Sequence, residues 1–391
     1  MKAVVFERKE ARYAATALTT RLTETAAPRL APLRLADLDP PSLPGAGWHT
    51  VRPRLSGICG SDLALLKGRT SRYFEALASM PFVLGHEVVG DLDDGRRVVI
   101  DAVLGHAARG EPPPHAGAAP ADGNDYGHLT AGPLGAGLQT GSCKRTGGGW
   151  STEFVAHDSQ LHEVPEDLSD EAAVMVEPAA SAIHAALRAE VAEGDTVVVI
   201  GGGPIGLCAI AALRLGSAAE RIIAAVKYDE QQQLATRLGA DLVVKPNEIR
   251  RAVRRVVGCR MTGDLLSGGA DITVDAVGSP GSLADAVAVT RPRGSVVLCG
   301  MPGPGRIDLA PVWHREVALL GAYTYGTEHL ADGTSAHTFD MAFELVRSER
   351  LEELVSATYR LEDYAAALRH ADQAGRRGSI KIAFDLRDER R

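Results

Sequence analysis

Four side chains in the first half of the chain are of types that bind metal ions and lie in short motifs. Cys59 lies in "GICGSDL", His86 and Glu87 lie in "LGHEVVG", and Glu177 lies in "VEPAASAIHAAL". A catalytic zinc takes about three protein ligands from cysteine, histidine and carboxylate side chains and keeps one position for water. A Cys, a His and a Glu would satisfy that requirement. Their separations follow no local rule for metal ligands, so a buried thiol, a structural histidine and a carboxylate at a helix start stay open as alternatives.

A glycine-rich stretch in the middle of the chain has the spacing of a dinucleotide-binding turn. In "VVVIGGGPIGLCAIAAL", Gly201, Gly203 and Gly206 follow the pattern G-x-G-x-x-G, with Pro204 and Ile205 between the last two. The first glycine makes the tight turn, the second lets a pyrophosphate approach the backbone, and the third lets the helix pack on the strand. The N-terminus of the following helix then faces the phosphates with unpaired N–H groups. We expect a nicotinamide dinucleotide to bind here.

The residues after this turn favour NADP over NAD. An acidic residue that binds the ribose 2′-hydroxyl is expected about 20 residues after the last glycine. Val226 stands there, and Lys227 follows it. Without the carboxylate a 2′-phosphate is not repelled, and a lysine can pair with it. In the alternative interpretation, Lys227 is a solvated surface residue and Asp229 or Glu230 reaches the ribose.

The composition is that of a globular chain, for which small-molecule partners are expected. The 391 residues include 42 basic and 50 acidic side chains, for a formal net charge of -8, and 45% of the residues are hydrophobic. No overall positive charge attracts the chain to nucleic acid or to an anionic membrane. Five widely spaced cysteines without a CxxC pair indicate no disulfide framework. The N-terminus has no apolar run of signal-peptide length, so we expect a cytoplasmic protein.

The character of the sequence changes near residue 180. Before it, short apolar alternations between Pro- and Gly-rich turns are typical of a β-rich domain. From Asp195, β-branched runs alternate with helical stretches, which predicts βαβ units and a parallel sheet. After about Tyr323, a helical pattern and the strand-like "SIKIAFDL" are expected to pack back on the first half. The uncharged run from Thr196 to Leu213 has the length of a membrane span, but residues 201–204 would break such a helix.

Four motifs occur in an order that resembles the zinc-dependent medium-chain dehydrogenase/reductase family, which includes the alcohol, sorbitol and threonine dehydrogenases. These motifs are "GICGSDL", "GHEVVG", "VEP" and "VVVIGGGPIGL", and the resemblance extends from "MKAVVF" to "SIKIAF". It implies an α/β chain with a β-rich, partly closed-barrel (GroES-like) catalytic domain, interrupted by an inserted Rossmann domain with a doubly wound parallel sheet. The expected boundaries are 1–180 and 324–391 for the catalytic domain and 181–323 for the Rossmann domain, with the active site in the cleft between them.

The resemblance also implies roles for the residues of these motifs. Cys59 and His86 would be zinc ligands, and Glu177 would be the third ligand or one that acts through water. Glu87 would be the neighbouring carboxylate that can exchange onto the metal. Ser61 would hydrogen-bond the substrate oxygen and begin a proton relay.

The chemistry that the resemblance implies is hydride transfer between a nicotinamide cofactor and a secondary alcohol or polyol, with zinc as a Lewis acid on the substrate oxygen. Gly300 and Met301, in "CGMPG", would lie along the nicotinamide. Relatives are commonly dimers or tetramers, so a homodimer or homotetramer is expected. Two other functions stay open. One is a zinc-free reductase of activated alkenes or quinones, and the other is a catalytically silent nucleotide-binding protein.

The sequence departs from the family between residues 107 and 149. Many relatives bind a second, structural zinc there through four cysteines, whereas this stretch contains only Cys143. We therefore expect one catalytic zinc per chain and no four-cysteine site. Much of 107–135 is expected to be mobile. Four polar residues of this region are expected to be solvated rather than ligands: His106, His115, Asp125 and His128.

Two further positions leave the proton path and the pocket open. Relatives with "CGSDLH" have a relay histidine where this chain has Ala64, so the route of the proton beyond Ser61 is not predicted. Trp150 could line the substrate cleft or belong to the barrel core.

Overall fold

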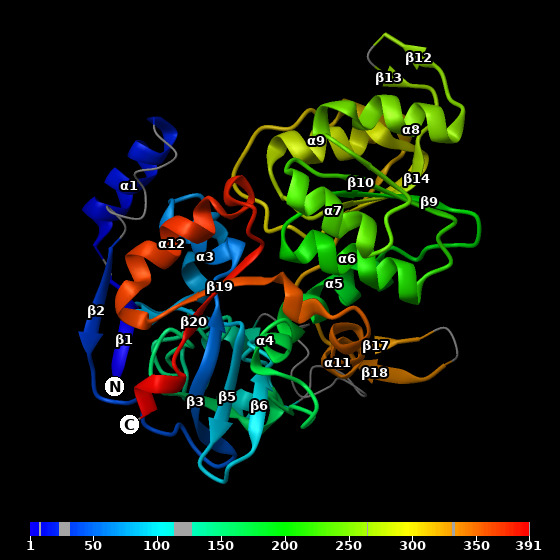
Figure 1. Cartoon of the computed structure of the whole chain (residues 1–391). Helices are drawn as coiled ribbons and strands as arrows, with labels where there is room; N and C mark the ends of the chain where they lie inside the picture. Colours follow the sequence, from blue (N-terminus) through cyan, green and yellow to red (C-terminus); the bar gives the residue numbers. More distant parts are fainter. Residues whose placement is uncertain (8, 23–31, 113–126, 264, 331–332, 391) are drawn as a thin grey trace. The chain divides into compact units, whose positions relative to one another are not determined.

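The computed structural model describes residues 1–390 apart from 8, 23–31, 113–126, 264 and 331–332 (Figure 1). Contacts between residues divide the chain into two units. Unit 1 comprises Met1–Glu177, His329–Ala374 and Lys381–Arg391, and unit 2 comprises Pro178–Glu328 and Gly375–Ile380. The domain boundaries expected from the sequence, at residues 180 and 323, stay predictions.

Two β-sheets in the described part of unit 1 are built from short strands, as its alternating sequence pattern predicts. The small sheet is antiparallel and has the order β2 (Leu33–Asp37), β1 (Lys2–Phe6), β4 (Phe82–Val83). In the large sheet, β3 (Trp48–Gly57) pairs with three strands, including β7 (Phe154–His157) at its first half. The order of the large sheet is β19 (Val355–Tyr359), β20 (Lys381–Asp385), β3, β5 (Val88–Leu92), β6 (Arg97–Ile100), β8 (Leu161–Glu163).

Of the described helices that precede β7, two lie where the sequence indicates mainly β-structure. They are α1 (Glu10–Leu22) and α3 (Gly60–Leu66). The sequence of α1, rich in alanine and threonine, has no clear apolar stripe and so gives little periodic signal for a helix. The other helices that lie in unit 1 or begin there are α4 (Asp170–Ala173), α5 (Val176–Arg188), α11 (Thr338–Ser348) and α12 (Tyr364–Asp372).

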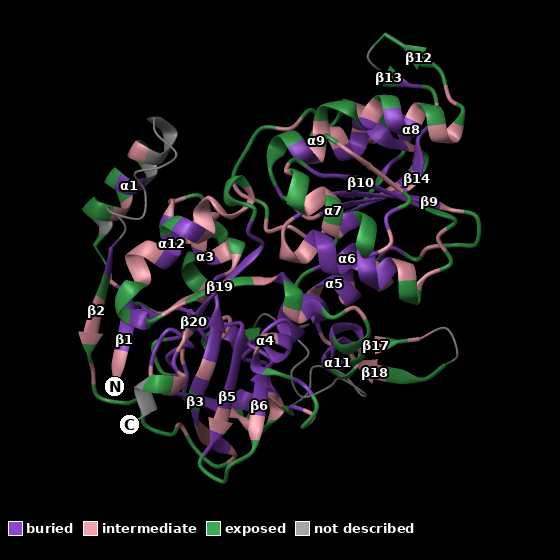
Figure 2. Cartoon of the chain, viewed as in Figure 1, coloured by how far each residue is buried: buried purple, intermediate pink, exposed green. Residues whose placement is uncertain are grey.

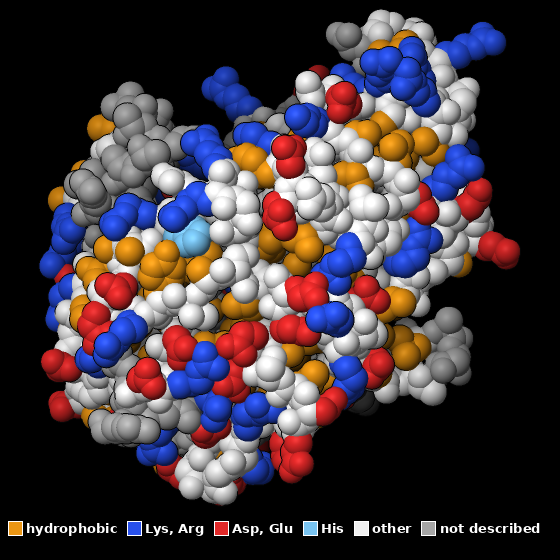
Figure 3. Space-filling model, in the orientation of Figure 1, with side chains coloured by type: hydrophobic (Ala, Val, Ile, Leu, Met, Phe, Trp, Pro, Cys, Tyr) orange, Lys and Arg blue, Asp and Glu red, His pale blue; other side chains and the backbone are white. Residues whose placement is uncertain are grey.

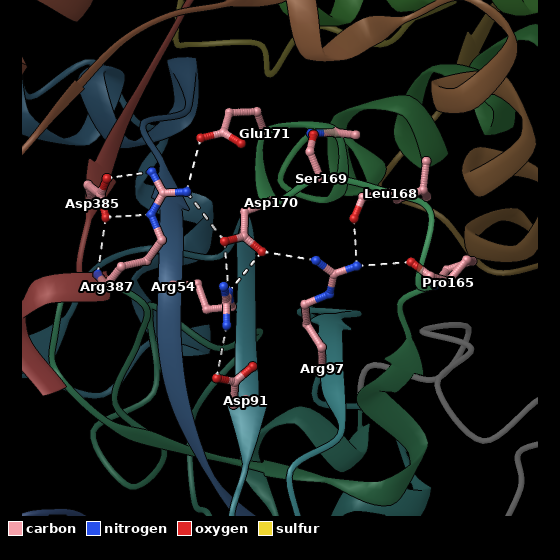
Figure 4. Close-up of polar contacts among 11 residues, drawn as sticks. Arg54, Asp91, Arg97, Pro165, Leu168, Ser169, Asp170, Glu171, Asp385 and Arg387 are labelled. Carbon is pink, nitrogen blue, oxygen red and sulfur yellow. Dashed lines mark hydrogen bonds and ion pairs between the residues drawn. The ribbon is translucent and has the colours of Figure 1, made fainter.

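Asp170 joins segments of unit 1 that are far apart in the sequence (Figure 4). Its carboxylate accepts hydrogen bonds from Arg54 Nε in β3, at 2.7 and 2.8 Å, and from Arg97 Nη1 in β6, at 3.3 Å. Arg387, just after β20, donates to it at 3.4 Å. The Asp170 side chain is 4% exposed. A buried carboxylate is tolerated only when paired, so the three guanidinium groups and Asp170 depend on one another.

Trp150 belongs to the core of unit 1. It is 0% exposed, its Nε1–H donates to the carbonyl of Gly57 at 3.2 Å, and its ring packs edge-on against Phe384 with centroids 5.2 Å apart. Of the two positions that the sequence leaves open for this tryptophan, the structure shows the core position.

The described part of 107–149 is organised around the buried guanidinium of Arg109. Its Nε donates to the carbonyl of Leu104 at 2.9 Å, and its Nη atoms donate to the carbonyls of Ala131, Gly135 and Gly137. The residue is 3% exposed. Because a guanidinium presents five donors in a fixed fork, one side chain can hold several turns together.

The solvation expected for His106 and His128 is wrong. They are only 4% and 5% exposed, and their ring centroids are 6.4 Å apart. The segment shares a small apolar core with β3, β7 and Leu104, which its irregular, Gly- and Pro-rich sequence does not indicate. The other two residues of that prediction, His115 and Asp125, lie outside the described residues.

The mobility expected for 107–135 falls partly on 113–126, also outside the described residues, and stays a prediction. The small apolar core beside His106 in the sequence consists of Trp48, Leu104, Ala108, Leu134, Cys143 and Val155.

The main sheet of unit 2 has six parallel strands with helices on both faces, which confirms the predicted α/β fold class. In Figure 1, α8 (Ile249–Val257) and α9 (Pro280–Val289) lie on one face, and α6 (Pro204–Gly216) and α7 (Asp229–Arg237) lie on the other. The strand order reverses between β9 and β14, as in a doubly wound Rossmann sheet. The order is β11 (Leu242–Val244), β10 (Arg221–Ala225), β9 (Thr196–Ile200), β14 (Ala270–Asp275), β15 (Thr290–Leu298), β16 (Ala318–Gly321).

The uncharged run Thr196 to Leu213 is divided between β9, a glycine turn and α6. Figure 2 shows that β9 and much of α6 are buried within unit 2. No helix in the described parts of the chain is long and apolar enough to cross a membrane. On the face in Figure 3, acidic and basic side chains are interspersed around β3 and β5. The remaining elements are α10 (Ala310–Arg315), the hairpin of β12 (Met261–Thr262) and β13 (Leu265–Leu266), β17 (Thr327–His329) and β18 (Ser335–His337).

Candidate active site

Cys59 lies at the start of α3, in the turn that follows β3. Its backbone N–H donates to Asp62 Oδ2 at 2.9 Å. Asp62 is the third residue of α3, so this bond closes the first helical turn around the cysteine. Cys59 itself is partly exposed. The thiol is therefore held in place by the local fold while it stays accessible.

His86 is positioned between two side chains of α3. Its Nδ1 lies 3.5 Å from Asp62 Oδ1, and its Nε2 lies 3.5 Å from Ser61 Oγ. The residue is 6% exposed. A metal-ligating histidine commonly has one ring nitrogen beside a carboxylate, which leaves the other nitrogen to the metal. His86 has this arrangement, with Nε2 on the side of Ser61.

Cys59, His86 and Glu87 form one group, in which a thiol sulfur, an imidazole nitrogen and a carboxylate oxygen lie within 4.8 Å of one another. The antiparallel pairing of β3 with β5 brings them together, because Cys59 follows β3 while the other two residues precede β5. Thiolate, imidazole and carboxylate are the donors that zinc takes in proteins. The residues present therefore fit a zinc ion.

Glu177 is buried, 7% exposed, as the second residue of α5. It is not a member of the group within 4.8 Å that the described residues form. Its charge nevertheless acts on His86. Burial alone lowers the pKa of His86, but the negative charges of Asp62, Cys59 and Glu177 outweigh burial and raise this pKa well above its usual value.

Glu87 has a partner that the sequence analysis missed. Lys381, the first residue of β20, donates from Nζ to both carboxylate oxygens of Glu87, at 2.6 and 2.5 Å. Both side chains are 1% exposed. Burial alone lowers the pKa of Lys381, but Glu87 and, further off, Cys59 and Glu177 raise it above the ordinary lysine value. A buried positive charge thus belongs to the surroundings of the metal-binding group.

The glycine turn of unit 2 has the geometry that its spacing predicts. Gly201 has a φ of +114°, which favours glycine, and a Cβ on Gly206 would lie 2.2 Å from the carbonyl oxygen of Gly201. Gly203 is the N-cap of α6, Pro204 is its first residue, and Ile205 follows. The helix therefore starts close to the strand, with its first N–H groups at the turn.

Gly300 and Met301 follow β15 at the same edge of this sheet, where the parallel strands end. The N–H of Gly300 donates to the carbonyl of Asp275 at 2.8 Å, and a Cβ on Gly300 would lie 2.6 Å from the backbone of Val277. The Asp275 carboxylate in turn accepts the N–H groups of Val277 and Gly278. The two loops are thus tied together at the edge where dinucleotides bind in such sheets.

Comparison with known proteins agrees with both halves of this description. Residues 45–166 match the family model of the alcohol dehydrogenase GroES-like domain, and residues 204–347 match that of the zinc-binding dehydrogenases. The chain belongs to the zinc-dependent medium-chain dehydrogenase family.

The relatives, and solved structures with a similar fold, extend over almost all of the chain. L-idonate 5-dehydrogenase of Vitis vinifera is 26% identical over 90% of this chain and 93% of its own length, and sorbitol dehydrogenase of Arabidopsis thaliana is 29% identical over 89% and 92%. The 2R,3R-butanediol dehydrogenase of Bacillus subtilis has a TM-score of 0.67 at 23% identity, covering 90% and 96% of the two chains. An alcohol dehydrogenase of E. coli with NADH has a TM-score of 0.69 at 22% identity, covering 98% and 99%.

This medium-chain dehydrogenase is therefore a zinc-dependent oxidoreductase of alcohols or polyols, as the sequence predicts. The comparisons favour neither the zinc-free reductase nor the catalytically silent nucleotide-binding protein.

At the end of β10, this medium-chain dehydrogenase has no carboxylate at the usual ribose-binding position. Val226 occupies that position and is 0% exposed. Lys227 is exposed, and its Nζ lies 5.5 Å from the centroid of the Tyr228 ring. Asp229 and Glu230 are exposed first residues of α7. Both a cation and two carboxylates are thus available next to the strand end.

Proposed function

We propose that this enzyme interconverts a secondary alcohol or polyol and its carbonyl compound by hydride transfer with a nicotinamide dinucleotide. The group of Cys59, His86 and Glu87 within 4.8 Å, with the Ser61 hydroxyl beside His86, is the observation that carries the proposal. Polyol substrates are favoured because the relatives are named sorbitol, L-idonate and butanediol dehydrogenases.

Cys59, His86 and Glu177 would hold the zinc ion, and Glu87 would be the neighbouring carboxylate. Lys381 already occupies both oxygens of Glu87, which favours Glu177 as the third ligand. The buried position of Glu177 and its effect on His86 agree with that assignment. When bound, zinc supplies Lewis-acid polarisation of the substrate oxygen.

Ser61 would bind the substrate oxygen and take its proton during alcohol oxidation. Its Oγ lies 3.5 Å from His86 Nε2, and a hydroxyl can accept one hydrogen bond while it donates another. Ala64 offers no further proton carrier on α3. The proton then leaves Ser61 through water or a ribose hydroxyl.

The glycine turn, from Gly201 to Gly206, would bind the pyrophosphate, and Gly300 and Met301 would lie along the nicotinamide. We favour NADP because Val226 removes the carboxylate and the exposed Lys227 can pair with a 2′-phosphate. Substitution of Lys227 by Ala tests this preference. We expect the affinity for NADPH to fall about tenfold while that for NADH is retained, and an unchanged NADPH affinity would contradict the assignment.

We further propose a cytoplasmic homodimer or homotetramer that uses the edge of the unit 2 sheet. β16 is the last strand of that sheet, and its residues Ala318, Leu319 and Gly321 are exposed. Trp313 in α10 is 81% exposed, and Leu309 and Leu319, close to it in the sequence, are 56% and 36% exposed. Contiguous exposed apolar surface marks interaction sites. Light scattering on a Trp313→Lys variant tests this surface, since a lysine there should yield monomers.

Zinc content tests the reaction and its site together. We expect the substitution Cys59→Ser to lower the zinc content by one ion per chain and to abolish NAD(P)-linked oxidation of polyols. Cys259→Ser, at a partly exposed cysteine of unit 2, is the matched control and should keep both. An unchanged zinc content in the Cys59 variant would exclude the proposed site.

A further inference from the structure

A second group of metal-binding side chains lies in unit 1, separate from the Cys59 group. Asp101, His162 and His337 place a carboxylate oxygen and two imidazole nitrogens within 4.8 Å of one another. Asp101 directly follows β6, His162 is the middle residue of β8, and His337 is the last residue of β18. Segments from three parts of the chain therefore converge on one point.

The sheet fixes the first two of these side chains relative to each other. β6 and β8 pair antiparallel, and the pairing continues past β6, where the N–H of Asp101 donates to the carbonyl of Gln160 at 2.8 Å. Residues two apart on a strand point to the same face of a sheet. Asp101 and His162 are therefore diagonal neighbours on one face, close enough for their side chains to share a ligand.

Asp101 is a buried carboxylate, 0% exposed, with one oxygen that lacks a hydrogen bond. Its Oδ1 accepts the N–H of Val103 at 2.8 Å, whereas Oδ2 receives none from any residue that the structure describes. Oδ2 lies 3.5 Å from His337 Nε2, which is longer than an ordinary N–H···O bond. Two ligands about 2.0–2.1 Å from one tetrahedral ion lie roughly 3.4 Å apart. Asp101 and His337 form an ion pair at this separation, and two ligands of one ion would lie about equally far apart.

The two imidazoles are held in place by neighbouring side chains. Their ring centroids are 4.8 Å apart, and the His162 ring stacks on Phe339 with centroids 4.6 Å apart. Asp340 Oδ1 lies 3.9 Å from His162 Nδ1, on the side where an outer carboxylate commonly orients a ligating histidine. The side chains of His162 and His337 are 17% and 14% exposed, so ions in solution have access to the group.

We propose that Asp101, His162 and His337 bind a divalent transition-metal ion, with water completing its coordination. Two imidazoles and a carboxylate suit Zn²⁺, Co²⁺ or Ni²⁺. The site contains no thiol among its three residues, so it differs chemically from the Cys59 group. An ion there joins β6, β8 and the start of α11, and it raises the metal content of the chain to two ions.

Binding has a consequence for α11. His337 Nδ1 accepts the N–H of Phe339 at 3.2 Å and so caps this helix. When Nε2 of a neutral imidazole coordinates a metal ion, the ring proton is on Nδ1, which then cannot accept a hydrogen bond. An ion bound at Nε2 therefore removes the N-cap hydrogen bond of α11, because the Phe339 N–H no longer has His337 Nδ1 as its acceptor.

Titration of the metal-free full-length protein with Co²⁺ tests the proposal. We expect two Co²⁺ per chain, of which only one gives thiolate-to-cobalt charge-transfer absorption. His162→Ala and the isosteric Asp101→Asn should each bind one Co²⁺ and keep that absorption. Cys59→Ser should lose the absorption but keep the second ion, so the two sites are distinguished. His314→Ala, at an exposed histidine of unit 2, is the control and should bind two.

Two results would overturn the second site. One is a wild-type protein that binds a single Co²⁺ per chain and shows the thiolate-to-cobalt absorption, because that ion lies at the Cys59 group. The other is the binding of two Co²⁺ by both the His162 and the Asp101 variants, because the second ion would then lie elsewhere. Loss of the charge-transfer absorption alone concerns the Cys59 group and leaves this proposal standing.

Discussion

The ammonium group of Lys381 contacts both carboxylate oxygens of Glu87, a residue 294 positions earlier in the chain, and the two side chains are each 1% exposed. Glu87 is adjacent to His86 and belongs to the group of Cys59, His86 and Glu87 whose side chains could hold a metal ion. Gly57 makes room for this pair, since a Cβ there would lie 2.0 Å from Glu87 Oε2. The position of the carboxylate therefore depends on a charge from the C-terminal strand and on a glycine from β3.

Substitution of Lys381 by Met should lower the free energy of unfolding by about 3–5 kcal/mol, because it leaves the carboxylate of Glu87 buried without a counter-charge. Chemical denaturation measures the change. The double variant with Glu87→Gln should recover part of the loss, since no unpaired charge remains. A Lys381 variant as stable as the wild type would show that the pair does not stabilise the fold.

The pH dependence of that loss has a defined sign. The pKa of Lys381 is raised in the folded state, so its contribution is fully present below the unfolded lysine value of about 10.4 and is lost as the pH rises through the folded value. The stability difference between wild type and Lys381→Met should therefore stay constant from about pH 7 to pH 9 and shrink above about pH 10.4. A difference that shrinks already by pH 8 would contradict this account.

Substitution of Arg109 by Lys should loosen the turns of the 107–149 segment and destabilise the protein by about 2 kcal/mol. An ammonium group has no planar fork and cannot serve all four carbonyls, so some are left buried and unsatisfied. Hydrogen exchange in peptides covering residues 104–111 and 129–137 reports the loosening. Arg145→Lys, at an exposed arginine of the same segment, is the control and should behave as wild type.

Substitution of Gly206 by Ala should weaken dinucleotide binding and destabilise unit 2 by about 1–3 kcal/mol. The added methyl group would overlap the carbonyl oxygen of Gly201, and a backbone atom cannot move aside cheaply. Gly216→Ala on the same helix is the matched control, because nothing lies within 4 Å of a Cβ there. Calorimetric titration with NADPH and thermal unfolding should separate the two variants, and equal behaviour would argue against close packing at the turn.

Substitution of Asp170 by Asn should destabilise unit 1 by about 1.5–3 kcal/mol, because Arg54, Arg97 and Arg387 would lose their charge-assisted hydrogen bonds to one buried carboxylate (Figure 4). Asp167→Asn provides the comparison. Asp167 pairs with Arg347 at the surface and its side chain is 60% exposed, so its loss should cost less than about 1 kcal/mol. Urea denaturation measures the free energy of unfolding of both variants. Similar decreases in the two would show that the contacts of Asp170 with the three arginines do not stabilise unit 1.

The sequence predicts the unit 2 sheet well because its elements follow from local patterns. β9, the glycine turn and α6 are specified by contiguous residues whose periodicity and glycine spacing have direct structural meaning. Asp62 was missed although a signal exists, since an acidic residue three positions after Cys59 is typical of a capped helix start. Lys381 has no such signal, because only the pairing of β20 with β3 brings it to Glu87.

The group of Asp101, His162 and His337 also could not be predicted from local sequence patterns. Asp101 and His162 meet through strand pairing, and His337 arrives from a third segment, so no spacing in the sequence relates them. His106 and His128 are buried in a region whose apolar core has members scattered from Trp48 to Val155. Composition alone describes that segment as irregular, which is true of its backbone but not of its packing.

The cation that holds the turns of the 107–149 segment together is the guanidinium of Arg109, which is a side chain and not a bound ion. A chelator cannot extract a guanidinium, oxidants do not convert it to a disulfide, and its charge persists at every physiological pH. The turns around it can therefore form as soon as the polypeptide is complete, whatever the supply of metal in the cell. The four carbonyls that Arg109 contacts therefore have a partner that needs no metal ion.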